Sequence, residues 1–219
     1  VPVGVEFFVQ PIVMPSESMQ DLLPVFARVA NYVVTNGVDY NLFQNHRRVI
    51  LYVGAISEWI DVELLERVAV SFPSETLRLI GPFVVNVDRL MHLPNVEFIG
   101  ASDRRLVVEQ IKQASVCLVP FLACELIKHT ATSINKVYEY LAAGKPVVSI
   151  GRPKARFEDE HPGLIYSAAT INEFIEHIKT ALAEETPSML AEVRKTFAQS
   201  YDWDYKAREM VEIINGAVA

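Results

Sequence analysis

The sequence predicts an α/β fold: a doubly wound, Rossmann-like parallel sheet followed by C-terminal helices. Two observations carry this prediction. From Arg48 onward, short runs rich in β-branched residues alternate with segments whose apolar residues recur at helical spacing. Because the runs are almost wholly apolar, they are typical of parallel strands that helices cover on both faces. The predicted strands are Val49–Gly54, Leu77–Ile80, Val96–Ile99, Val116–Pro120, Pro146–Ile150 and, with a weaker pattern, Gly163–Tyr166.

The helices between these strands follow from apolar stripes and from residues that start or stop a helix. The stripe in Asp61–Phe72 consists of Val62, Leu65, Val68 and Ala69, and that in Asp103–Gln113 of Leu106, Val107 and Ile111. Ile134–Ala143 follows Ser133, which we expect to be the N-cap, and Gly144 ends it. Three further helices are predicted: Ile171–Glu184, Ser188–Gln199 and Asp204–Asn215.

Residues 1–47 do not fit the start of this domain. Phe7–Met14 and Tyr32–Val34 read as strands around the helix Ser16–Phe26, a fragment too small to bury its own faces. We therefore predict that residues 1–33 are the remnant of an N-terminal domain, 34–47 a linker, 48–200 the Rossmann-like domain and 201–219 a C-terminal crossing helix. The sequence has no internal repeat and no low-complexity segment.

Composition excludes several classes of function. The chain has 219 residues and a formal net charge of −7, which argues against nucleic acid as a partner because phosphate backbones require clustered basic residues. No apolar run is long enough for a membrane span. Cys117 and Cys124 are expected to be reduced thiols in a cytoplasmic protein. The histidines lack metal-ligand spacing, so no metal site is predicted.

Five segments, in order along the chain, resemble the group 1 (family 4) bacterial glycosyltransferases. The most specific is Ser133–Val148, SINKVYEYLAAGKPVV, in which a helix with Lys and Glu is followed by a Gly turn and a Pro-Val-Val strand. The others are Ile12–Met19 (IVMPSESM), Val34–Phe43 (VTNGVDYNLF), Tyr52–Ile56 (YVGAI) and Pro94–Gly100 (PNVEFIG). The resemblance implies the C-terminal, donor-binding half of a glycosyltransferase B fold, which would bind UDP-, GDP- or another nucleoside-diphosphate sugar and need no separate cofactor.

The resemblance also implies roles for individual residues. Glu139 would accept hydrogen bonds from the donor ribose, and Ile99 and Gly100 would present backbone groups to the base. His129 and Thr130 would lie near the donor sugar. The diphosphate would lie at the helix N-terminus, where amides and the helix dipole stabilise anions. Its expected ligands are Lys136, Ser133, Ile134, Thr132, Gly54 and Ala55.

Plainer interpretations of the same residues stay open. Lys136 and Glu139 are three residues apart, so they also fit a surface ion pair, and the hydroxyls before the helix fit an ordinary cap. His129 fits a solvated loop histidine. Trp59, in the loop after the first strand, fits a packing residue better than a ligand contact.

Three departures from the family pattern bear on activity. Ala55 stands where the family usually has an arginine after the first-strand glycine, Ser57–Asp61 lacks the lysine that usually follows a few residues later, and Ala131 stands where the family has a first glutamate. Another cation must then neutralise the leaving diphosphate, and the nearest candidates are Lys136, Lys128 and Arg152. A branch of capsule, teichuronic-acid and exopolysaccharide enzymes looks similar in this loop, which favours an active enzyme with a different phosphate contact.

The function predicted is sugar transfer to a polysaccharide or lipid-linked acceptor, which the missing N-terminal domain would bind and where any catalytic base would lie. One alternative is a non-catalytic nucleotide-sugar-binding or scaffold module. An epimerase on the same fold is weaker, because no acid/base set is evident. The C-terminal stripe of Ala207, Met210, Val211 and Ile214 predicts self-association if it is exposed. Peripheral contact with the inner membrane also remains open.

Overall fold

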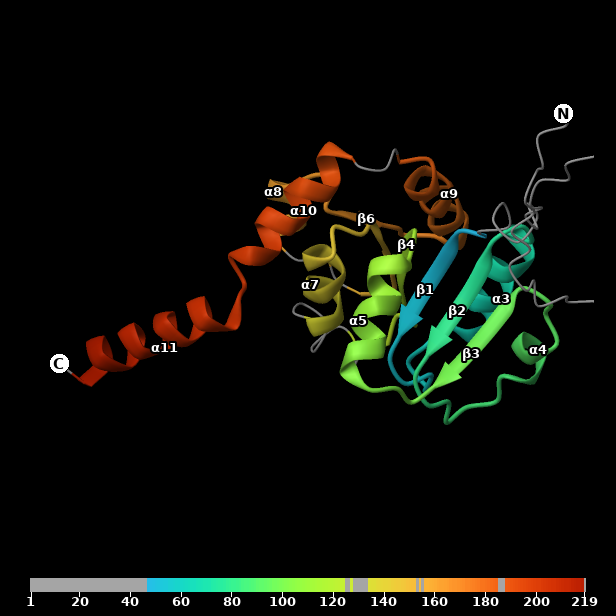
Figure 1. The fold of residues 1–219 in the computed structure, drawn as a ribbon, viewed down its shortest axis with the longest axis horizontal. Helices are drawn as coiled ribbons and strands as arrows, with labels where there is room; N and C mark the ends of the chain where they lie inside the picture. The colour runs from blue at the N-terminus through green and yellow to red at the C-terminus, as the bar shows by residue number, and fades with distance from the viewer. Residues whose placement is uncertain are drawn as a thin grey trace, which may run out of the picture. The chain divides into compact units, whose positions relative to one another are not determined.

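The computed structural model describes residues 47–124, 127, 134–152, 154, 156–184 and 188–218, all within the compact unit His46–Ala219. Its centre is a six-stranded sheet in the order β3-β2-β1-β4-β5-β6, and every pair of neighbouring strands is parallel (Figure 1). This order is that of a doubly wound, Rossmann-like sheet. The predicted N-terminal remnant and all but the last residue of the predicted linker lie outside the described residues.

All six predicted strands are present, with bounds within two residues of the prediction. They are β1 (Val49–Val53), β2 (Thr76–Ile80), β3 (Val96–Gly100), β4 (Val116–Pro120), β5 (Val147–Ile150) and β6 (Ile165–Ser167). The central strands β1 and β4 are the most deeply buried, and Leu51 and Leu118 have no exposed surface. In the central strands the apolar runs therefore do mark residues that are covered on both faces, whereas the edge strands β3 and β6 are only partly buried.

Helices cover both faces of the sheet. In Figure 1, α5 and α7 lie in front of the strands and α3 lies behind them. The helix α10 packs against α7, whereas α9 contacts β4, β5 and β6. The helices are α3 (Val62–Ser71), α4 (Asp88–Met91), α5 (Arg104–Gln113), α7 (Asn135–Ala142), α8 (Arg156–Glu160), α9 (Ile171–Leu182), α10 (Met189–Gln199) and α11 (Trp203–Val218).

Side-chain caps fix the start of several helices. Asp61 accepts a hydrogen bond from the amide of Leu64 at 2.8 Å, and Asp103 does the same for Leu106 at 2.9 Å. The cap predicted for α7 is wrong. Ile134, rather than Ser133, occupies the N-cap position, and its side chain has no oxygen that could accept a hydrogen bond from the first amides of α7.

The structure differs from the sequence prediction at two other places. The four-residue α4 and the five-residue α8 were not predicted, because a helix of about one turn has too few positions to show a periodic stripe. Leu106 was predicted on the buried stripe of α5 but is 39% exposed. It lies in the first turn of α5, and Ile111 is the buried residue of that helix.

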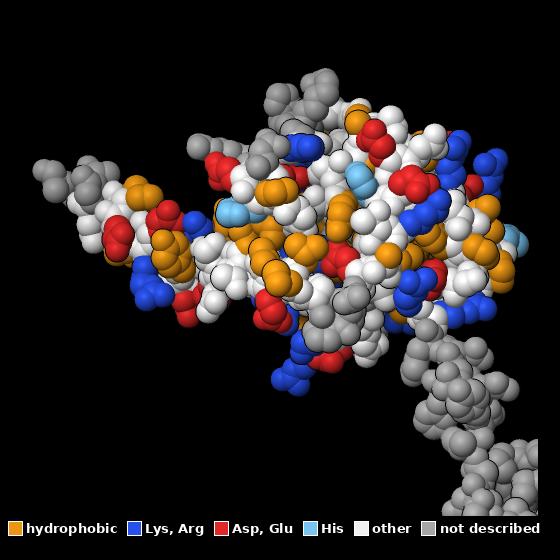
Figure 2. Space-filling model, turned by 90° about the horizontal axis from the view of Figure 1, so that it is seen from above, with side chains coloured by type: hydrophobic (Ala, Val, Ile, Leu, Met, Phe, Trp, Pro, Cys, Tyr) orange, Lys and Arg blue, Asp and Glu red, His pale blue; other side chains and the backbone are white. Residues whose placement is uncertain are grey.

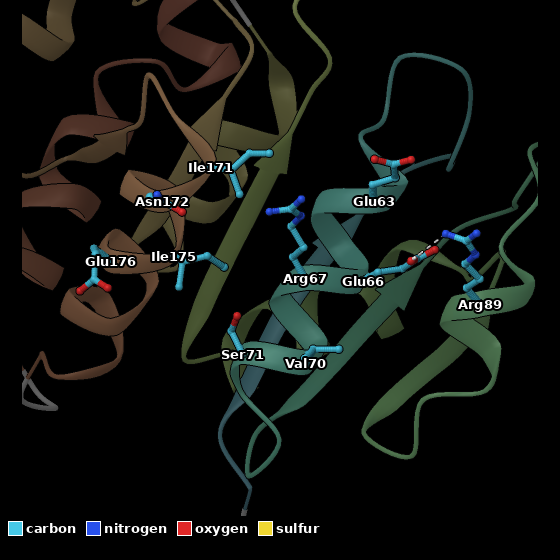
Figure 3. A pocket seen from close by; sticks show the side chains of 10 residues that line it. All are labelled: Glu63, Glu66, Arg67, Val70, Ser71, Arg89, Ile171, Asn172, Ile175 and Glu176. Atoms are coloured by element: carbon cyan, nitrogen blue, oxygen red, sulfur yellow. Dashed lines mark ion pairs between the residues drawn. The ribbon is translucent and has the colours of Figure 1, made fainter.

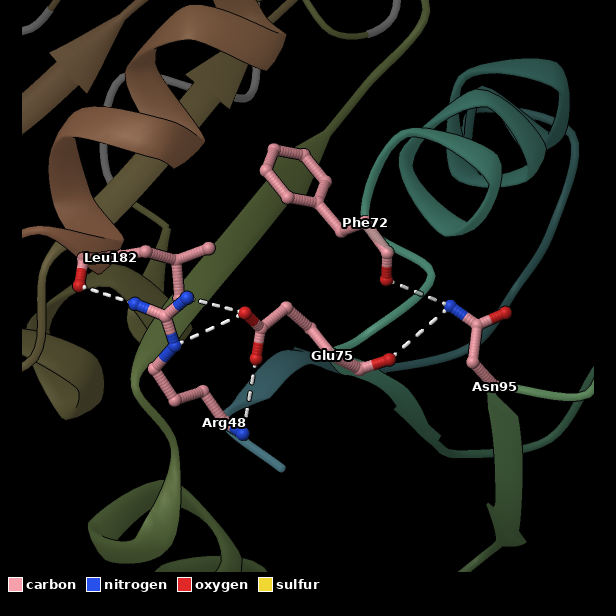
Figure 4. A network of polar contacts seen from close by, with 5 residues as sticks. All are labelled: Arg48, Phe72, Glu75, Asn95 and Leu182. Carbon is pink, nitrogen blue, oxygen red and sulfur yellow. Dashed lines mark hydrogen bonds and ion pairs between the residues drawn. The ribbon is translucent and has the colours of Figure 1, made fainter. Parts of the chain in front are cut away.

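A polar network joins the amino ends of the strands on the side away from the predicted site (Figure 4). Arg48 donates from Nε to Glu75 at 3.1 Å and from Nη1 to the carbonyl of Leu182 at 2.9 Å. Asn95 donates to the carbonyls of Phe72 and Glu75 at 3.0 and 3.2 Å. The network thus ties together the amino ends of β1, β2 and β3 and the end of α9, at the opposite end of the strands from Gly54 and Gly100.

Candidate functional site

The strand order reverses between β1 and β4, since β2 and β3 lie on one side of this pair and β5 and β6 on the other. In a parallel α/β sheet the loops that leave such a pair of strands diverge, so a crevice opens at the carboxyl ends of the strands. Gly54 follows β1, and α7 starts on the same side of the sheet after β4. Two predicted phosphate ligands, Gly54 and Lys136, therefore lie at the point where the strand order reverses, which we call the switch point.

Lys136 lies against the glycine that follows β1. Gly54 has a φ of +138°, and a Cβ on it would lie 2.5 Å from Lys136 Nζ and 3.0 Å from Tyr52 Oη. Only glycine therefore leaves room for the ammonium group at this point of the loop. The amide of Gly54 donates to Ile80 O at 2.8 Å, which fixes the loop to the end of β2. Residues that are 82 positions apart in the sequence thus form one compact group.

The ammonium group of Lys136 is poorly solvated. It lies 4.4 Å from the centroid of the Tyr52 ring and 5.6 Å from that of Phe121, and it donates to Tyr52 Oη at 3.2 Å. Burial lowers the pKa of Lys136 from 10.5 to about 8, and the Glu139 carboxylate opposes this shift. Within the described part of the chain, no carboxylate forms an ion pair with it. A desolvated cation of this kind favours an anionic ligand.

Glu139 lies on the same helix as Lys136, and 33% of its side chain is exposed. The Nη1 atom of Arg104 donates to its Oε1 atom at 3.0 Å. Sequence reasoning missed Arg104. Its only signal was its position directly after the Asp103 cap at the start of α5, near the end of β3. The structure therefore places a second cation beside the residue that was predicted to bind ribose.

The predicted base-binding residues lie at the end of β3. Gly100 has a φ of +63°, its carbonyl accepts from the amide of Gly81 at 2.8 Å, and a Cβ added to it would meet nothing within 4 Å. Ile99 is half-buried against the core. This end of β3 therefore offers open space on the carboxyl side of the sheet, and the base-binding roles of Ile99 and Gly100 stay predictions.

The remaining predicted ligands divide into two groups. Ala55 is on the loop after Gly54, and its carbonyl accepts from Tyr52 Oη at 2.9 Å. Ile134 occupies the N-cap position of α7. Six other residues that the sequence analysis considered lie outside the described residues: Lys128, His129, Thr130, Ala131, Thr132 and Ser133.

Two further candidates are resolved by their contacts. Arg152, considered as a cation for the diphosphate, is buried instead in an ion pair with Glu158, with Nη1 and Oε1 2.7 Å apart and both side chains 3% exposed. Its guanidinium also donates to Ser149 Oγ at 3.1 Å. Arg152 is therefore committed to a buried polar cluster. Trp59 packs against the hydrophobic core, in agreement with the plainer interpretation.

Of two cavities in the described part of the domain, one contains a predicted site residue and the other does not. A cavity of about 840 Å³ runs from Arg104 and Glu139 along α7 to Tyr201, Trp203 and Met210. A second, of about 530 Å³, lies between α3 and α9, where Arg67 points into the gap between Glu63 and Ile171 (Figure 3). The second cavity contains none of the residues predicted for the site. Among the described residues, no group of three His, Cys, Asp or Glu side chains could hold a metal ion, and no helix is long and apolar enough to cross a membrane.

The fold and the crevice define a Rossmann-like domain in which a half-buried lysine and a half-buried glutamate lie where the strand order reverses. The family model described as "Glycosyl transferases group 1" matches residues 47–184. This match covers more than half of the chain. The chain therefore belongs to the group 1 glycosyl transferases, and the resemblance of its motifs to that family is confirmed.

Individual relatives agree with this membership. The Bacillus subtilis protein named teichuronic acid biosynthesis glycosyltransferase TuaH is 24% identical, over 83% of this chain and 50% of TuaH. Sucrose-phosphate synthase from Thermosynechococcus elongatus matches with a TM-score of 0.60 and 19% identity, over 82% of this chain and 48% of the synthase. HepE from Anabaena, in complex with UDP-glucose, matches with a TM-score of 0.58 and 14% identity, over 81% of this chain and 51% of HepE. The structural matches show the fold, and the chain spans about half the length of these relatives.

Proposed function

We infer that this chain binds the nucleoside-diphosphate part of a sugar donor in the crevice at the carboxyl ends of β1 and β4. The observation that carries the proposal is the position of Lys136: a desolvated ammonium group against Gly54, on the same helix as Glu139. An ammonium beside a glycine loop suits a diphosphate, because the backbone can approach the anion closely. A carboxylate suits the two ribose hydroxyls, because it only accepts hydrogen bonds.

The activity we propose for the protein to which this chain belongs is transfer of a sugar from the bound donor to a polysaccharide or lipid-linked acceptor. Family membership and the likeness to TuaH support it. In such a transfer the leaving diphosphate gains negative charge, which a fixed cation stabilises. Lys136 would supply this charge from the helix side, where Ala55 leaves the loop without the usual arginine. The acceptor would contact parts of the protein outside this domain.

We propose that the donor carries a uracil base, since HepE is in complex with UDP-glucose. We also propose a cytoplasmic location, with or without contact to the inner membrane surface, because the free thiols of Cys117 and Cys124 are typical of a reducing compartment.

The binding proposal is tested by isothermal titration with UDP, GDP and ADP and their sugar conjugates. We expect UDP to bind more tightly than GDP or ADP. Glu139→Ala should weaken UDP binding by roughly tenfold to a hundredfold, because it removes hydrogen bonds to a charged group. Glu109→Ala is the matched control, because Glu109 is an exposed helical glutamate paired with Lys112. Equal affinities in the wild type and Glu139→Ala would refute the ribose assignment.

The second candidate, a non-catalytic binding module, is favoured by Ala55. It predicts the same binding but no turnover. Release of nucleoside diphosphate from the donor, in the presence of a lipid-linked acceptor and the whole protein, separates the two functions.

A further inference from the structure

The hydroxyl group of Tyr52 connects Lys136 to the loop after β1. Tyr52 is the fourth residue of β1 and is 1% exposed. Its Oη atom receives a hydrogen bond from Lys136 Nζ at 3.2 Å and donates one to Ala55 O at 2.9 Å. One hydroxyl therefore contacts both sides of the crevice where the diphosphate is proposed to bind.

The direction of these hydrogen bonds is fixed by chemistry. A tyrosine hydroxyl has one proton, and a backbone carbonyl can only accept, so the Tyr52 proton is directed to Ala55. The lone pairs of Oη then face Lys136, and the lysine must be the donor. Burial raises the pKa of Tyr52 well above its usual range, so the hydroxyl keeps its proton at any pH at which the protein is used. The arrangement favours the charged ammonium form of Lys136.

We propose that Tyr52 is a positioning residue that holds the Lys136 ammonium group against Gly54, ready for the donor diphosphate. The inference rests on the proposed function. The ring restrains the ammonium on one side, with its centroid 4.4 Å from Nζ, and the hydroxyl takes one of its three donors. Among the described residues no other group accepts from this ammonium, and its other two donors are proposed to bind diphosphate oxygens. A phenylalanine at position 52 would keep the ring but lose the hydroxyl.

Tyr140 provides a matched control. It is also fully buried, and its hydroxyl also contacts the end of β1, where it accepts from the amide of Val53 at 3.0 Å. No hydrogen bond joins it to Lys136 within the described part of the chain. Tyr140→Phe should therefore destabilise the same region without affecting the lysine.

The first measurement is the pKa of Lys136 without nucleotide, from competitive acetylation of the lysines over a pH series with mass spectrometry. Among the described residues, the titratable groups that bear on Lys136 are Tyr52 from β1 and Glu139 on its own helix. Tyr52→Phe removes an acceptor of the ammonium form, so we expect the Lys136 pKa to fall, whereas Tyr140→Phe leaves it unchanged. The same pKa in Tyr52→Phe as in the wild type would overturn the inference.

The second measurement is nucleotide affinity across the same pH series. We expect Tyr52→Phe to bind nucleoside diphosphate about tenfold more weakly, with affinity declining at a lower pH than in the wild type. Affinity for the unphosphorylated nucleoside should not change. A wild type that binds no nucleotide would refute the proposed function, yet the acetylation result would still decide the role of Tyr52. A loss of affinity that is equal for nucleoside and nucleoside diphosphate would contradict a contact made through Lys136.

Discussion

Gly54 shows how one residue shapes the site. Its φ of +138° is rare for residues with a side chain, and the place of its Cβ is next to Lys136 Nζ. The glycine signal in the sequence was weak alone, since a glycine after a strand is common. In the structure the absence of a Cβ on Gly54 leaves the space that Lys136 Nζ occupies.

Replacing this glycine should separate binding from stability. Gly54→Ala should displace the flexible Lys136 side chain and weaken nucleotide binding by about tenfold, besides costing roughly 1–2 kcal/mol through backbone strain. Gly163→Ala is the control, because Gly163 has a φ of +91° and its Cβ would make only ordinary contact with Leu190. Titration calorimetry and urea unfolding of both variants test this. Equal loss of binding in the two variants would contradict it.

Lys136 should make binding dependent on pH. Its pKa in the ligand-free protein is about 8, below the usual 10.5, and only the charged form attracts a diphosphate. Affinity should therefore be constant below about pH 7 and decline above pH 8, by up to tenfold per unit, since binding must then take up a proton. Lys136→Arg should remove this decline, because arginine stays charged. Affinity that is flat up to pH 9.5 in the wild type would rule out a role for Lys136.

The pKa of Lys136 also has a consequence for folding, with the opposite sign. The pKa of Lys136 is lower in the folded than in the unfolded chain, so between about pH 8 and 10.5 the unfolded chain binds more protons. Stability therefore rises with pH through this window, and the destabilisation caused by the charged lysine is largest below pH 8. At neutral pH the charged Lys136 therefore lowers the stability of the fold and is at the same time able to bind an anion. This trade-off is typical of functional rather than structural residues.

At the scale of elements, the strands could be predicted almost completely. Short apolar runs such as Val116–Pro120 were recognisable because both faces of the strand are buried. The helices that Asp61 and Asp103 cap were predicted to begin at these two residues, although neither was identified as a cap. The one-turn helices α4 and α8 could not be predicted, because no periodic signal marks them, and the capping signal of Ser133 placed the start of α7 one residue too early.

The site could be predicted only in part, for a related reason. Motif resemblance selected Gly54, Lys136 and Glu139, but it did not reveal Arg104 or the hydroxyl of Tyr52. Arg104 and Glu139 are 35 positions apart, and Tyr52 and Lys136 are 84 positions apart. Such contacts depend on how the sheet brings loops together, which local sequence patterns do not encode. Arg152 illustrates the converse, since its buried partner Glu158 cannot be inferred from its charge.

A buried arginine joins α10 to the rest of the domain. Arg194 has no exposed surface, donates to both oxygens of Glu184 at 2.7 Å, and contacts Gly163 O at 3.0 Å. Arg194→Met should cost about 3–5 kcal/mol in the free energy of unfolding, because it leaves a mostly buried carboxylate without its cation. Lys195→Met, which removes an exposed pair with Glu192, should cost less than about 1 kcal/mol. Similar urea midpoints for the two variants would contradict this assignment.

At the scale of the whole molecule, α11 exposes the apolar stripe that the sequence indicated. Figures 1 and 2 show this helix extending from the α/β body, with hydrophobic side chains among charged ones. Met210 is 54% exposed, Val211 56% and Ile214 60%. An apolar stripe on an unpacked helix favours association.

This chain should therefore self-associate. Sedimentation velocity over a range of protein concentrations should show a species larger than the monomer, which the double variant Val211→Asp, Ile214→Asp abolishes. Val70→Asp, at an exposed apolar residue on a different helix, α3, should leave the association unchanged. A wild type that sediments as a monomer at every concentration would contradict the prediction.

The central claim is that a nucleoside diphosphate binds at the carboxyl ends of β1 and β4. Its most direct test is to map amide chemical shifts of the isotope-labelled chain during titration with UDP. The account predicts the largest changes at Gly54, Gly100 and the first turns of α7, with little change around Arg67 and Ile175. Changes concentrated in the cavity between α3 and α9, or no changes at saturating nucleotide, would contradict it.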